Sequence, residues 1–75
     1  MSKRLGNIQL DRQLAELQAY AVEVFGDRDA ALRWLDTGLS ELDDLSAREI
    51  VIRTGAPGLE RARDVLLRIE YGVYS

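Results

Sequence analysis

Residues 59–75, LERARDVLLRIEYGVYS, carry apolar side chains at two separate helical spacings. The first line follows steps of three and four residues, as in an amphipathic α-helix, and consists of Leu59, Ala62, Leu66, Ile69 and Val73. The second line consists of Leu67, Tyr71 and Tyr74 and lies roughly 135° around the helix from the first, at about 100° per residue. We therefore predict a helix from about Leu59 to Gly72 or beyond, with one face in the core and a second apolar face left over.

The N-terminal half of the chain predicts two further helices. The first runs from about Ile8 to Phe25, and its apolar stripe consists of Leu10, Leu14, Leu17, Ala21 and Val24. Gly26 suits a helix stop because glycine adopts the left-handed conformation at low cost, and Asp27 suits the N-cap of the next helix. That second helix is short, from about Arg28 to Asp36, with a core side formed by Ala31, Trp34 and Leu35.

The middle of the chain predicts a third helix between two turns. Ser46 and Glu49 form a capping-box pattern, which starts a helix from about Ala47 to Arg53. Ser40 is predicted to cap a single turn through Leu42, and residues 54–58, TGAPG, break the chain before the last helix. The fold class is thus all-α, a compact bundle of four to five short helices over residues 8–75, preceded by a disordered N-terminus of residues 1–7.

Length and charge restrict the kinds of partner. The chain has 75 residues, a net charge of −3 at pH 7, and neither cysteine nor histidine. A domain of this size has a marginal core and often depends on oligomerisation or a partner. Its negative charge disfavours nucleic acid and anionic lipid. No apolar run approaches the ~20 residues that span a membrane, and no signal peptide is recognisable, so we expect a cytoplasmic protein.

The side chains offer little for catalysis. Without histidine and cysteine, the commonest general base and the thiolate ligands are missing. Ser40 and Ser46 are expected to be caps, and Asp43–Asp44 is expected to be a solvated turn, because calcium loops supply many more oxygens. We therefore expect no enzyme activity, no catalytic residue, no metal and no cofactor. A helix-turn-helix after Val24 would offer Arg28 and Arg33 to DNA, but their acidic neighbours make that face a poor major-groove reader.

The C-terminal tyrosines leave two alternatives, a tail tucked into the core and a tail presented to a partner. A buried Tyr71 or Tyr74 would need a hydrogen-bond partner for its hydroxyl. At an interface, the ring can be covered by the partner while the hydroxyl contacts water. We favour the interface, either with another protein or with a second copy of this chain across a two-fold axis. Trp34, by contrast, is expected to be a core residue.

Three stretches resemble, in order and spacing, the toxin-binding domain of the MbcA/ParS/Xre antitoxins: residues 21–27 (AVEVFGD), 30–37 (AALRWLDT) and 68–75 (RIEYGVYS). The resemblance covers about residues 15–75. The family usually has proline at the positions of Gly38 and Ala47 and a glycine pair at Asp43–Asp44, whereas Gly58 matches a family glycine. Aspartate tolerates left-handed backbone better than most residues, so the turn at Asp43–Asp44 is expected to survive.

The resemblance implies an antitoxin of a type II toxin–antitoxin system whose partner is a RES-type, NAD-consuming toxin. It implies inhibition by occlusion of the toxin's active site, with the partner-binding residues Leu67, Arg68, Tyr71, Val73, Tyr74 and Ser75 at the C-terminal end. Many relatives also carry an N-terminal DNA-binding region, for which the residues before the resemblance have room for one helix at most. The alternative function is a homodimerisation or regulatory module of a small transcriptional regulator.

Overall fold

Four α-helices and one short 3₁₀ helix make up the protein. The computed structural model describes the backbone of residues 2–72 and the side chains of residues 8–72. The elements are α1 (Ser2–Phe25), α2 (Arg28–Leu35), the 3₁₀ helix η1 (Ser40–Leu42), α3 (Ala47–Thr54) and α4 (Ala56–Glu70). Within residues 2–72 there is no strand, only an isolated bridge between Leu39 and Leu45. The predicted all-α fold is confirmed.

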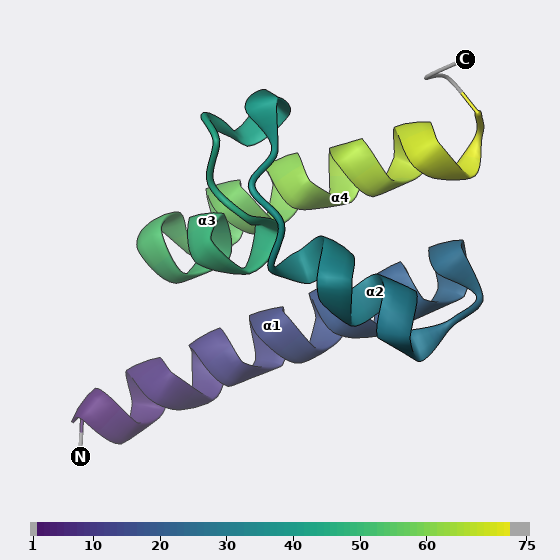
Figure 1. The fold of residues 1–75 in the computed structure, drawn as a ribbon. Helices are drawn as coiled ribbons and strands as arrows, with labels where there is room; N and C mark the ends of the chain where they lie inside the picture. Colours follow the sequence, from purple (N-terminus) through teal and green to yellow (C-terminus); the bar gives the residue numbers. More distant parts are fainter. Residues whose placement is uncertain (1, 73–75) are drawn as a thin grey trace.

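Helix α1 is the central helix of the bundle. It packs against α2, α3 and α4, and α3 and α4 pack against each other. Figure 1 shows α4 running in the same general direction as α1, with α2 folded back along the C-terminal half of α1. The N-terminal end of α1 extends past the other helices, which agrees with the elongated principal extents of 46 × 24 × 17 Å.

The core lies where the predicted apolar stripes meet. Its buried side chains are Leu17, Ala21, Ala31, Leu35, Leu42, Ala47, Ile50, Val51, Leu59, Ala62, Val65 and Leu66. The other members of the α1 stripe, Leu10, Leu14 and Val24, are partly buried against this cluster. Trp34 also packs against it, with its ring centroid 6.0 Å from that of Phe25. The core predictions for α1 and α2 are therefore confirmed.

Side-chain caps explain where the short helices begin. The Asp27 carboxylate accepts from the amide of Ala30 at 3.2 Å, as predicted for an N-cap. The Ser46 hydroxyl likewise accepts from the Glu49 amide at 3.1 Å. The Glu49 carboxylate pairs with Arg53 at 3.3 Å. The predicted cap at Ser40 is wrong, because the residue before η1 is Leu39 and no side chain caps that turn.

The starts of α1 and α4 differ from the predictions. α1 begins at Ser2 rather than Ile8. α4 begins at Ala56 rather than Leu59, since Pro57 sits in its first turn, where its fixed φ fits a helix and no amide is needed. The predicted break of residues 54–58 is therefore a single residue, Gly55, which lies between α3 and α4 and has φ 72°. The division of the chain into residues 1–7 and a domain from residue 8 stays a prediction.

Close backbone approaches shape the middle of the domain. Asp43 and Asp44 adopt left-handed φ values of 58° and 67°, so the predicted turn survives without a glycine pair. A Cβ at Gly38 would lie 2.7 Å from the Asp44 carbonyl oxygen. A Cβ at Gly58 would collide with the Ile50 carbonyl oxygen. Gly58 is therefore the residue that lets α4 lie directly against α3.

Candidate functional site

Helix α4 presents two different faces, as its spacing predicted. Leu59, Ala62, Val65 and Leu66 are buried, and Ile69 is partly buried against them. On the outer face, Leu67 is 40% exposed and Tyr71, directly after the helix, is 75% exposed. The separation of one core face from one apolar outer face is confirmed for these residues.

The C-terminal end of α4 is set by its backbone. The helix ends at Glu70, earlier than the predicted Gly72 or beyond. Gly72 has φ 70°, a left-handed conformation that glycine adopts at low cost and that stops a helix. Helical spacing therefore applies only as far as Glu70. Val73, Tyr74 and Ser75, which were predicted as site residues, lie outside the described residues.

Charged side chains border the exposed line on both sides. Arg68, a predicted site residue, pairs with Asp64 at 2.9 Å on the same helix. On the side that faces α1, Arg63 pairs with Glu16 at 3.3 Å. A shallow depression of about 290 Å³ runs along this face, lined by Glu60, Arg63, Asp64 and Leu67. The candidate surface is thus an apolar strip with charged edges.

A second contact ties α1 to the last residue of α4. The Tyr20 hydroxyl donates to the Glu70 carboxylate at 3.0 Å. Partial burial raises the pKa of Tyr20 above its usual value of 10.0, and the hydrogen bond to the negatively charged Glu70 raises it further. Sequence reasoning missed this pair because no helical spacing relates residues that lie on different helices.

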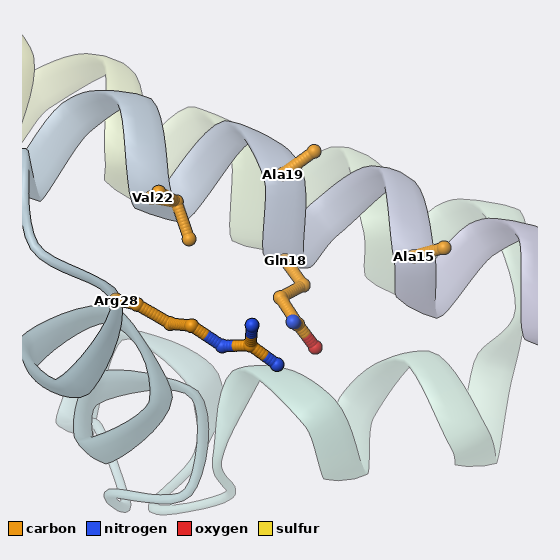
Figure 2. A pocket seen from close by; sticks show the side chains of 5 residues that line it. All are labelled: Ala15, Gln18, Ala19, Val22 and Arg28. Atoms are coloured by element: carbon orange, nitrogen blue, oxygen red, sulfur yellow. The ribbon is translucent and has the colours of Figure 1, made fainter.

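A second hollow, of about 420 Å³, lies between α1 and the start of α2 (Figure 2). Its lining residues are Ala15, Gln18, Ala19, Val22 and Arg28. Figure 2 shows the Arg28 side chain extended along α1 towards Gln18. The α1 residues of this hollow lie roughly 130° around the helix from Glu16 and Tyr20, at about 100° per residue. The hollow and the outer face of α4 are therefore separate surfaces.

Comparison with known families identifies the chain. The antitoxin Xre/MbcA/ParS C-terminal toxin-binding domain matches residues 20–72. The chain belongs to this family. Searches of curated proteins and of solved structures gave no match. Membership makes this protein the toxin-binding domain of an antitoxin, with a binding role and a toxin as its partner.

The family match includes the exposed line on α4 and one of its contacts with α1. It starts at Tyr20 and ends at Gly72, so it spans both ends of the Tyr20–Glu70 contact and the exposed line on α4. Among the described side chains, those of residues 8–72, no group of three or more acidic residues is placed to hold a metal ion. No helix in the same part of the chain is long and apolar enough to cross a membrane.

Proposed function

We propose that this antitoxin domain neutralises a RES-type, NAD-consuming toxin by covering its active site with the outer face of α4 and the residues after it. The partner-binding residues would be Leu67, Arg68, Tyr71, Val73, Tyr74 and Ser75. One observation carries the proposal: Leu67 on α4 and Tyr71 directly after it are exposed, whereas the opposite face of α4 is buried in the core of this toxin-binding domain.

The chemistry of this face suits a protein interface. Tyrosine brings a large rigid ring with a polar tip, and such side chains dominate the binding energy of many interfaces. Leu67 adds an aliphatic contact one turn before Tyr71. The Arg68–Asp64 pair lies at the edge, where exposed ion pairs contribute little energy but help to fix orientation.

Occlusion is a simple mechanism for a domain whose family role is to bind a toxin. The left-handed Gly72 redirects the chain directly after Tyr71. In this mechanism α4 provides the docking face and residues 73–75 enter the cleft.

Deletion of residues 73–75 tests the occlusion mechanism, because it leaves α4 and Gly72 in place. The expected result is weaker binding to a RES-type toxin and loss of rescue in cells that express the toxin. The matched control is Ile52→Ala, which removes an apolar side chain of α3 that is 53% exposed and lies outside the proposed face. Unchanged rescue by the shortened chain would refute the role of the tail.

A homodimerisation module is the second candidate, and the same exposed line favours it. Leu67 and Tyr71 would then meet their counterparts across a two-fold axis. Light scattering of the purified chain over a range of concentrations separates the two functions. A monomer at all concentrations would exclude the dimer and leave toxin binding in place.

A further inference from the structure

Two polar contacts link α1 to the outer edge of α4. Glu16 pairs with Arg63 at 3.3 Å, and Tyr20 donates to Glu70 at 3.0 Å. Because α1 and α4 run in the same general direction (Figure 1), the two contacts come in the same order along both helices: Glu16 and Arg63 first, then Tyr20 and Glu70. They lie beside the exposed strip and outside the buried core.

We propose that Tyr20 is a positioning residue for toxin binding: its hydroxyl holds Glu70, and thereby fixes the direction in which Leu67 and Tyr71 are presented. This inference rests on the function proposed above for the outer face of α4. Tyr20 would act through Glu70 and would not need to touch the toxin itself.

Glu70 lies at a position where such a contact can stabilise the helix. The last turn of a helix has carbonyl groups without intrahelical partners and frays easily. Arg63 lies seven residues earlier, about 10 Å along the helix axis, so its pair with Glu16 holds the middle of α4 and not its end. Ile69, the last described inward side chain of the helix, is only partly buried. Tyr20 thus supplies a long-range polar contact at the end that carries Tyr71.

A fixed end favours binding because the interface then loses less conformational freedom on association. If only a fraction of the free molecules hold the end of α4 in the competent direction, the apparent affinity falls by that fraction. Loss of one such hydrogen bond is expected to weaken toxin binding about fivefold. Its effect on global stability is expected to be small, because the contact is at the surface.

The main experiment compares the parent with Tyr20→Phe, which keeps the ring and removes only the donor. Amide hydrogen exchange in the free chain is read at Tyr71 and Gly72, whose amides bond to the carbonyls of Leu67 and Ile69. We expect faster exchange at these two amides and unchanged exchange near Ala62. We also expect an affinity about fivefold lower for a RES-type toxin, mainly through slower association.

Two variants of Glu70 provide the matched control. Glu70→Gln keeps an acceptor oxygen for the Tyr20 hydroxyl, whereas Glu70→Ala removes it. Exchange and affinity are expected to stay near the parent values in the first and to match those of Tyr20→Phe in the second.

Parent-like exchange at Tyr71 and Gly72 in Tyr20→Phe would overturn the positioning role. Faster exchange with unchanged toxin affinity would overturn it as well, because loosening the end of α4 would then have no effect on toxin binding. If the parent chain itself binds no RES-type toxin, the proposed function fails, and so does the toxin-positioning role that rests on it. The exchange result would then decide only whether Tyr20 anchors Glu70.

Discussion

The backbone amide of Tyr71 donates to the carbonyl of Leu67 at 3.0 Å, so the two residues stay one turn apart although α4 ends between them at Glu70. This backbone bond keeps Tyr71 on the side of the helix that Leu67 occupies. Both side chains are exposed, and the buried residues of α4 lie on the opposite face. The relationship gives the domain a defined apolar strip at its C-terminal end.

Substitutions of two neighbouring leucines of α4 are expected to affect different properties, one the folding stability and the other toxin binding. Leu66 is fully buried, whereas Leu67 is 40% exposed. Leu66→Ala is expected to lower the free energy of unfolding by about 2–5 kcal/mol, because it removes core contacts and leaves a cavity. Leu67→Ala is expected to change it by less than about 1 kcal/mol and to weaken toxin binding instead. Urea unfolding followed by Trp34 fluorescence measures the first effect; equal destabilisation by both variants would contradict the assignment of faces.

Gly58 is expected to tolerate no larger side chain. A methyl group there would meet the Ile50 carbonyl oxygen and the Thr54 hydroxyl, so α4 would have to move away from α3. Gly58→Ala is expected to destabilise the domain by about 1–3 kcal/mol, as overpacking of a core does. Glu60→Ala, an exposed change in the same turn, is the control for thermal unfolding. A Gly58→Ala variant as stable as this control would refute the close approach.

The cap of α3 predicts a difference between two serines. Ser46→Ala removes the acceptor of the Glu49 amide and is expected to cost about 1 kcal/mol of folding stability. Ser40→Ala removes a hydroxyl that caps no helix and is expected to cost less. The midpoints of urea unfolding report both values. Equal losses of folding stability in the two variants would show that the hydrogen bond from the Glu49 amide to Ser46 does not stabilise the domain.

Stability at alkaline pH tests the Tyr20–Glu70 contact. Partial burial and the bond to Glu70 raise the pKa of Tyr20 in the folded state above the ordinary value of 10.0. The stabilisation is therefore fully present below about pH 10 and is lost as the pH rises through the higher folded-state pKa. Between pH 8 and 11, the thermal midpoint of the parent is expected to fall more steeply than that of Tyr20→Phe. Parallel curves would argue against the contact.

Much of the fold was predictable because the signals are local. Three- and four-residue spacing placed Leu17, Ala21 and Leu66 in the core, and the oxygens of Asp27 and Ser46 marked the starts of α2 and α3. The end of α4 was predicted too late, because apolar residues continue past Gly72 while the backbone there is left-handed. Periodicity describes which side chains are apolar and does not report where the backbone leaves the helix.

The candidate site was predictable only in part. Leu67 and Tyr71 followed from helical spacing, and the structure leaves both exposed. Tyr20 and Glu16 could not be connected with α4, since their partners are set by how α1 lies along α4. Contacts of this kind depend on tertiary packing, which no spacing rule for a single helix encodes.

Toxin affinity of Tyr71→Ala, compared with that of Ile52→Ala, tests the central claim most directly. Both variants remove an exposed apolar side chain, at 75% and 53% exposure, and only Tyr71 lies on the proposed binding face. Binding to a RES-type toxin is expected to weaken by about thirtyfold or more for Tyr71→Ala, the size of a hot-spot residue, and to stay at the parent value for Ile52→Ala. Parent-like binding by Tyr71→Ala would contradict toxin recognition through the C-terminal end of α4.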